Sequence, residues 1–194
     1  MTKLAHIEVP EGLIASARDG AEAARERLYV ALSPAIFALI RRLVGRRAVA
    51  EDLFQETMMA LYEHLGDYRG EGPFGAWVRQ IAVSRCLMYL RSPWHRARLE
   101  LDASLEETAF RASPRALSGS ATADAIDLER ALASLSPTAR AVVWLYEVEG
   151  YSHEEIARAF GRTPSFSKSQ LARAHRRLRE RLEPDGVRQP CAPV

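Results

Sequence analysis

The chain has 194 residues, 47% of them hydrophobic, and its 27 Lys and Arg against 25 Asp and Glu give a net charge of +2. This apolar content is sufficient for packed cores and excludes a disordered chain. Period-two runs of Val, Ile and Thr, which predict strands, are nearly absent, so we expect an all-α protein.

Several function classes lack the residues that they need. No apolar run of about 18 residues predicts a membrane span, and the N-terminus lacks the apolar core of a signal peptide. Cys86 and Cys191 are far apart and the five histidines are scattered, so we predict no metal site. The sequence contains no phosphate-binding loop and no nucleophile elbow, so we predict neither an enzyme nor a cofactor. The simplest prediction is a cytoplasmic protein with free thiols.

The periodicity divides the chain into two small helical domains. Residues 13–91 have dense helical periodicity, and residues 92–126 shift to Ser, Ala, Pro and mixed charge, which is typical of a flexible linker. Residues 127–183 form the predicted second domain, a module of four helices. Residues 184–194 are expected to form a disordered tail.

An amphipathic helix is predicted over residues 48–65. The inward positions are Val49, Leu53, Thr57, Ala60 and Leu61. The outward positions are Glu51, Asp52, Gln55, Glu56, Met59 and Glu63. An acidic stripe disfavours DNA. It is either a solvated helix face or a docking surface for a basic protein partner, in which Met59 is an adaptable contact.

Residues 70–98 combine arginine with aromatic side chains, and no acidic residue occurs from 72 to 98. The candidates for binding are Phe74, Trp77, Arg79, Arg85 and Arg91. Such a mixture suits single-stranded DNA, whose bases stack on rings while its phosphates meet arginine. The alternative is that the aromatic rings build the core, which we favour for Trp77 because it faces the stripe of Ile81 and Met88.

Two helices are predicted next in the second domain, over 127–135 and 137–147. Leu128, Leu132 and Leu135 form one apolar stripe of the first. Ser136 and Pro137 are suited to be the cap and the first residue of the second.

Residues 151–182 have the pattern of a helix-turn-helix. Ser152 and Glu155 form a capping box, Gly161 is placed for a left-handed C-cap, and Thr163 and Pro164 begin a second helix.

The second helix has two different faces. Its inward positions are Ser167, Leu171, Ala174, Leu178 and Leu182, and its outward positions are Ser165, Ser169, Ala172, Arg173 and Arg176. Lys168, His175 and Arg177 flank the outward face. From 165 to 181 six cations stand against Glu180 alone, 6 − 1 = +5. A basic run alone is usually a solvated face, but the capped first helix and the short glycine turn favour DNA binding.

Over about residues 13–182 the chain resembles the extracytoplasmic-function (ECF) sigma factors of bacterial RNA polymerase. The stretch AEDLFQETMMALYEHL resembles the helix that docks on the polymerase clamp. DYRGEGPFGAWVRQIA resembles the loop and helix that melt the promoter, and YSHEEIARAFGRT with SKSQLARAHRRLRERL resembles the upstream-element reader. Three motifs in the right order, separated by a linker, make the resemblance strong.

The resemblance implies a role for each set of positions. Glu51, Asp52, Gln55, Glu56 and Met59 would dock on core polymerase. Phe74, Trp77, Arg79, Arg85 and Arg91 would melt the promoter and hold its downstream element. Lys168, Ser169, Arg173, Arg176 and Arg177 would read the upstream element in the major groove. The implied partners are core polymerase, through the clamp of its largest subunit and the flap, double-stranded and melted promoter DNA, and an anti-sigma factor.

Some positions depart from the family pattern. In the melting helix, Val83 and Ser84 replace an Arg-Asn pair and Met88 replaces an Asp. In the first turn of the recognition helix, Phe166 is also unusual. It either touches a thymine methyl group or packs on the neighbouring helix. Two other functions stay open: a stand-alone helix-turn-helix regulator, and a degenerate sigma-like interaction protein.

Overall fold

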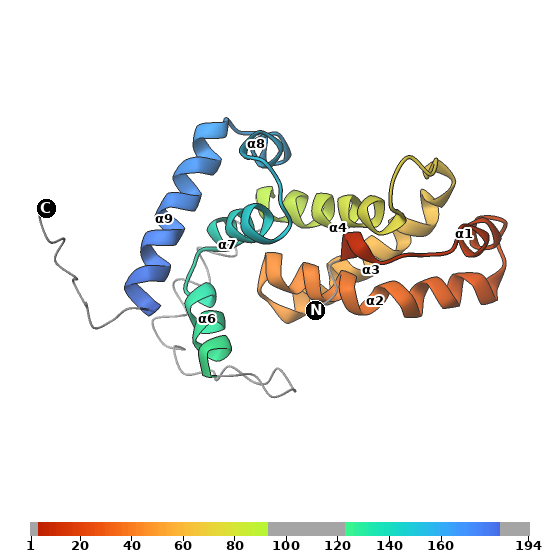
Figure 1. Ribbon diagram of the computed structural model, residues 1–194, viewed down its shortest axis with the longest axis horizontal. Coiled ribbons are helices and arrows are strands. Elements are labelled where there is room, and N and C mark those ends of the chain that lie inside the picture. Colours follow the sequence, from red (N-terminus) through yellow and green to blue (C-terminus); the bar gives the residue numbers. More distant parts are fainter. Residues whose placement is uncertain (1–3, 93–122, 183–194) are drawn as a thin grey trace, which may run out of the picture.

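The structure is a computed structural model that describes residues 4–92 and 123–182 (Figure 1). Every element in these two segments is helical, which confirms the predicted fold class. Most of the predicted linker, and the predicted tail, lie outside them. None of the helices in these segments combines the length and the apolar character needed to cross a bilayer.

The helices follow one another without strands between them in the described segments. The first segment contains η1 (Leu4–His6), α1 (Glu11–Arg18), α2 (Glu22–Val44), α3 (Arg47–Glu63), η2 (Leu65–Asp67) and α4 (Phe74–Arg91). The second contains α6 (Ala123–Ala133), α7 (Pro137–Val143), the π-helical turn η3 (Trp144–Val148), α8 (His153–Phe160) and α9 (Pro164–Leu182). Helix α6 begins inside the range predicted to be linker.

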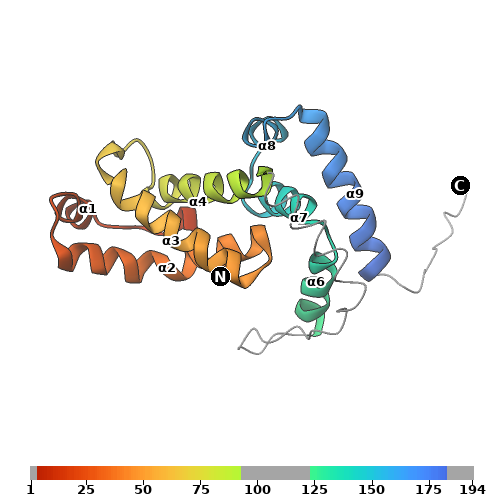
Figure 2. The same cartoon turned by 180° about the vertical axis from the view of Figure 1, so that it is seen from behind.

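The first domain is built on α2, α3 and α4, which pack against one another (Figures 1 and 2). Helix α2 buries a stripe at helical spacing, which comprises Leu28, Leu32, Ile36, Ile40 and Leu43. The chain then reverses at Gly45, whose φ of 79° is a left-handed conformation that favours glycine. This turn brings α3 back alongside α2.

Helix α3 buries the face that the sequence predicts. Val49, Leu53, Thr57, Ala60 and Leu61 are all buried. The one hydroxyl among them, that of Thr57, donates a hydrogen bond of 2.7 Å to the Leu53 carbonyl, so its burial leaves no polar group unsatisfied.

The first domain starts earlier than residue 13, where the sequence pattern placed its boundary. The turn η1 packs on α4, and Leu4 is only 3% exposed. The backbone approaches closely here, because a Cβ on Gly75 would overlap with the Leu4 carbonyl oxygen. The glycine therefore allows the N-terminal segment to lie on the first turn of α4.

Gly75→Ala is expected to destabilise the protein by ~1–3 kcal/mol, because the new methyl group meets backbone atoms rather than a flexible side chain. Urea unfolding followed by circular dichroism measures the change. Gly66→Ala is the matched control, since a Cβ there meets nothing within 4 Å. Equal stability of the two variants would show that the Leu4 contact does not constrain position 75.

The second domain differs from its prediction in one stripe and in one helix type. Ser136 caps α7 by accepting a hydrogen bond of 3.3 Å from the Ala139 N–H, as predicted, but the helix widens into the π turn from Trp144 onward. Of the leucines in the predicted stripe, Leu135 follows the end of α6 and is buried, whereas Leu128 is 45% exposed. Periodicity gives the apolar side of a helix but not how far along it a neighbour reaches.

The two domains share one hydrophobic core. Helix α7 packs on α2 and α8 packs on α4, so the buried side chains of both domains join in a single cluster. Cys86 lies in this cluster on α4 and is fully buried, and burial raises the pKa of its thiol to about 12.

The Cys86 thiol should therefore resist alkylation in the folded protein, because the thiolate is the reactive species. In a Cys191→Ser variant, which removes the other cysteine, iodoacetamide is expected to react at least ~100-fold more slowly without denaturant than in guanidinium chloride. Mass spectrometry of samples quenched at intervals measures both rates. Comparable rates would mean that Cys86 is accessible in the native state.

Candidate nucleic-acid and protein interfaces

Helices α8 and α9 form the predicted helix-turn-helix. The Ser152 Oγ accepts a hydrogen bond of 3.1 Å from the Glu155 N–H, and the Glu155 carboxylate accepts one of 2.8 Å from the Ser152 N–H. These hydrogen bonds lower the pKa of Glu155. Gly161 ends α8 in the left-handed conformation, with φ 62° and ψ 39°, and α9 begins at Pro164. The capping box, the C-cap and the start of α9 are all as predicted.

The outward face of α9 is exposed and basic. Ser165, Lys168, Ser169, Ala172, Arg173, Arg176 and Arg177 are all exposed. The Arg173 Nε donates a hydrogen bond of 3.2 Å to the Ser169 carbonyl, which orients its guanidinium along the helix. Arg173, Arg176, Arg177 and Glu180 line a shallow, open depression. On the opposite face Ser167, Leu171 and Ala174 are buried, whereas Leu182, the last residue of α9, is 44% exposed.

Two histidines hold α9 in place, and the sequence pattern did not identify either contact. The His153 Nδ1 lies 3.0 Å from the Oγ of the buried Ser167, and the ring stacks on Tyr146 with centroids 4.4 Å apart. The His175 Nε2 lies 3.0 Å from a carboxylate oxygen of Glu147. These contacts tie the first turn and the middle of the recognition helix to α8 and η3.

Phe166 packs inside the motif. Its ring lies 5.7 Å from that of Phe160, at an interplanar angle of 54°, and it is partly buried. Phe166 therefore packs on the neighbouring helix, which is one of the two roles considered for it.

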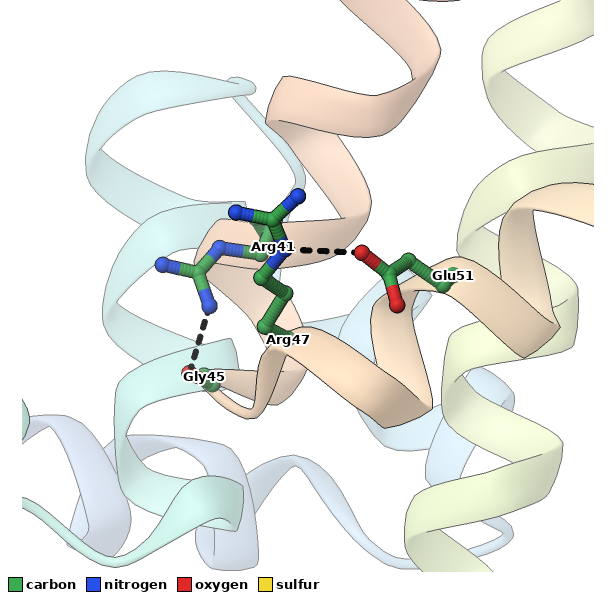
Figure 3. A network of polar contacts seen from close by, with 4 residues as sticks. All are labelled: Arg41, Gly45, Arg47 and Glu51. Carbon is green, nitrogen blue, oxygen red and sulfur yellow. Dashed lines mark hydrogen bonds and ion pairs between the residues drawn. The ribbon is translucent and has the colours of Figure 1, made fainter. Parts of the chain in front are cut away.

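The exposed face of α3 carries the acidic stripe. Glu51, Asp52, Gln55 and Glu56 are exposed, and Met59 is 63% exposed. The Nε of Arg47 lies 2.7 Å from the Glu51 carboxylate, near the turn where Arg41 approaches the Gly45 carbonyl (Figure 3). Asp52 and Glu56 form no ion pair with the residues that the structure describes, so these two carboxylates dominate the charge of the face.

The aromatic rings at the start of α4 lie largely in the core. Phe74 is 3% exposed, stacks on Trp77 with centroids 5.6 Å apart and meets Tyr68 edge to face. The interpretation of Phe74 as a stacking platform for bases does not fit this position, because its ring is not available at the surface. Trp77 is partly buried against the same cluster, which agrees with the core role favoured for it.

The three arginines of α4 do not lie together. Arg85 is partly exposed on the helix. The Nη1 of Arg79 donates a hydrogen bond of 2.9 Å to the Glu149 carbonyl, and the Nη1 of Arg91 donates one of 3.0 Å to the Ala159 carbonyl. Two of the three candidates for DNA binding therefore contact the second domain, a placement that no sequence pattern indicated.

The departures from the family pattern are divided between the two faces of α4. Val83 is buried, so its side chain belongs to the core. Ser84 is exposed and Met88 is 57% exposed, so these two replace the usual polar residues on the outer face of the helix.

Comparison with known proteins identifies both domains. The model of Sigma-70 region 2 matches residues 28–96, and that of Sigma-70 region 4 matches residues 125–178. The RNA polymerase sigma factor CarQ of Myxococcus xanthus is 34% identical over 167 residues, which cover 85% of this chain and 92% of that protein. The ECF RNA polymerase sigma factor SigM of Mycobacterium tuberculosis is 32% identical, over 72% of this chain and 67% of its own.

Solved structures agree with the sequence relatives. The sigma factor RpoE of Bartonella quintana, determined in complex with the anti-sigma factor NepR, superposes with a TM-score of 0.52 at 25% identity and covers 83% of this chain and 98% of that chain. The chain belongs to the ECF sigma factors and is an alternative sigma factor of RNA polymerase that acts in transcription initiation.

Proposed function

We propose that the protein binds core polymerase through α3, reads an upstream promoter element with α9 and holds the melted strand along α4. The observation that carries this proposal is the asymmetry of α9, whose basic face is exposed while its apolar face is packed against the rest of the second domain. Only the exposed face is available to a partner, and its charge selects a polyanion.

The helix α9 is suited to the major groove of duplex DNA, which admits one α-helix. Arg173 and Arg176 lie at i and i+3 on the exposed face, and a guanidinium can donate two hydrogen bonds to one guanine. Lys168 and Arg177 at the edges of this face would contact phosphates, which position the helix without reading sequence. The few base contacts then give sequence specificity, and the phosphate contacts supply most of the affinity.

The acidic face of α3 is suited to a basic protein surface rather than to DNA. Its carboxylates would steer the encounter with the clamp of the largest polymerase subunit, and the exposed Met59 would supply an adaptable apolar contact. Polymerase and promoter binding would together drive strand separation, so the protein acts by binding and not by catalysis.

Two further proposals follow from the partners. A protein that works on core polymerase and promoter DNA acts in the bacterial cytoplasm. The neighbouring structure of Bartonella quintana RpoE contains an anti-sigma factor, and we propose a protein of this class as a regulator of this chain too.

Run-off transcription with purified core polymerase on a library of genomic promoter fragments tests the proposed function. Stimulation of a subset of promoters is expected, and no stimulation of any fragment would overturn the proposal. Gel shifts with the protein alone separate it from a stand-alone regulator. Tight, specific binding without polymerase would favour the regulator, because a sigma factor should need the core enzyme.

A further inference from the structure

The entry loop, residues 68–73 between η2 and α4, is anchored near both ends by Tyr68. The Tyr68 carbonyl accepts a hydrogen bond of 2.9 Å from the Arg18 Nη2, and its hydroxyl donates one of 2.6 Å to the Gly72 carbonyl. The Tyr68 ring meets that of Phe74 edge to face, with centroids 5.0 Å apart. One residue therefore connects the start of the loop, its end and the first turn of α4, and Arg18 fixes that residue from another helix.

Arg18 is the last residue of α1, and this helix is fixed to the core of the first domain. Ala17 beside it is buried, and the Ala17 carbonyl accepts a hydrogen bond of 3.1 Å from the Arg25 Nε of α2. Helix α1 also packs on η2, and in both views it lies at the same end of the domain as the entry loop (Figures 1 and 2). Arg18 thus reaches the loop from a packed helix that precedes residue 28, where the match to Sigma-70 region 2 begins.

The Arg18 contact fixes the direction of one peptide group in the loop. A trans peptide is planar, with its C=O and N–H on opposite sides, and the described residues contain no cis peptide. Since the Tyr68 carbonyl points at Arg18, the N–H of Arg69 points the other way. The N–H groups of residues 69–72 donate to no other group in the parts of the chain that the structure describes, so they stay available to acceptors outside the protein.

Without its anchors the entry loop has other shapes open to it. Gly70 and Gly72 have φ values of 77° and 142°, and glycine exchanges such conformations for the usual ones at little cost. Water competes for the exposed Arg18 hydrogen bond, so its loss should shift the loop between shapes a few-fold and not unfold the domain. A ligand that binds one shape then binds more weakly, in proportion to the fraction of molecules that have this shape.

We propose that Arg18 is a positioning residue for promoter melting, which holds the entry loop in the shape that receives the unpaired strand. This inference rests on the proposed function, because it takes the entry loop as part of the strand-binding surface of α4. Unpaired bases expose the acceptors of their pairing edges, and the N–H groups of the loop complement them. Arg18 itself touches no nucleotide and acts through Tyr68.

Trypsin cleavage after Arg69 measures the entry loop without polymerase or DNA, because a protease cuts a native loop when the loop leaves its folded shape. Arg18→Gln removes the donor, Arg18→Lys keeps a cationic donor, and Arg27→Gln is the matched control. Arg27 is exposed on α2 and forms no hydrogen bond or ion pair with any other described side chain. Mass spectrometry follows the cleavage over time, and thermal unfolding checks the fold.

Cleavage after Arg69 should be about threefold or more faster in Arg18→Gln than in the unsubstituted protein. It should be unchanged in Arg27→Gln and close to the unsubstituted rate in Arg18→Lys. Equal rates in Arg18→Gln and Arg27→Gln would overturn the inference, because the loop would then keep its shape without the Arg18 donor.

Permanganate oxidation of unpaired thymines measures strand separation by the reconstituted holoenzyme on the promoters that run-off transcription selects. Arg18→Gln should lower the equilibrium constant for promoter opening about threefold or more, and Arg18→Lys should restore it. Affinity for core polymerase should be the same in all variants, which a general loss of structure would not allow. Faster loop cleavage with unchanged strand separation would overturn the role of Arg18 in melting. If the unsubstituted protein opens no promoter, the proposed function fails, whereas normal opening by Arg18→Gln contradicts this inference alone.

Discussion

Replacing Asp52 and Glu56 together by lysine is expected to weaken binding to core polymerase by roughly 100-fold. Both carboxylates are exposed on α3, and neither is neutralised by an ion pair within the described part of the chain. Reversing them turns attraction for a basic docking surface into repulsion. The fold should be unaffected, because the buried face of α3 is unchanged.

Affinity is measured by fluorescence anisotropy of labelled protein titrated with core enzyme, and thermal unfolding checks the fold. Glu8→Lys with Glu11→Lys is the control, since both residues are exposed, Glu8 before α1 and Glu11 at its first position. The control should bind within about threefold of the unsubstituted protein, because distant surface charges act weakly at physiological salt. If both double variants lost affinity equally, the acidic face of α3 would be a solvated surface and not the docking site.

Arg173→Ala should reduce binding to promoters that contain the upstream element by ~1–3 kcal/mol, or roughly 5- to 150-fold. Arg173 is exposed in the middle of the outward face, and its hydrogen bond to the Ser169 carbonyl presents the guanidinium in a fixed direction. Loss of a base contact removes discrimination, so promoters without the element should be affected much less.

Paired templates with and without the upstream element, transcribed by the reconstituted holoenzyme, measure this difference. Arg181→Ala removes one cation from the exposed end of the same helix and serves as the control. It should affect both templates alike, as a phosphate contact would. Equal loss on both templates with Arg173→Ala would mean that this residue positions the helix without reading bases.

Local spacing predicted the parts of the molecule that depend on one helix or one turn. The buried face of α3 and the capping box of Ser152 and Glu155 are set by residues three or four apart, and both are as predicted. The spacing placed Leu128 and Leu182 on apolar stripes, yet they are 45% and 44% exposed, because exposure depends on how far the packing partner extends along the helix.

Contacts between residues far apart in the sequence produce no periodic pattern, so the sequence did not predict them. Arg91 donates to a backbone carbonyl of the second domain, which any residue type provides. Arg79 pairs with Glu149, but the two residues are 70 positions apart, so no local spacing connects them. Phe74 follows the glycine-rich loop that resembles a melting element, yet its ring completes a cluster with Tyr68 and Trp77. The motif indicated the correct family, while the position of each side chain depended on the tertiary fold.

The approach of Arg140 to Gly45 has a consequence for sequence variation among relatives in which α7 packs on α2 in the same way. A Cβ at position 45 would overlap with the guanidinium of Arg140, so that flexible side chain would have to move out of its present place. A relative with a larger residue at 45 should therefore have a shorter one at 140, and the two positions should vary together. Relatives in which they vary independently would be expected to hold their domains in a different arrangement.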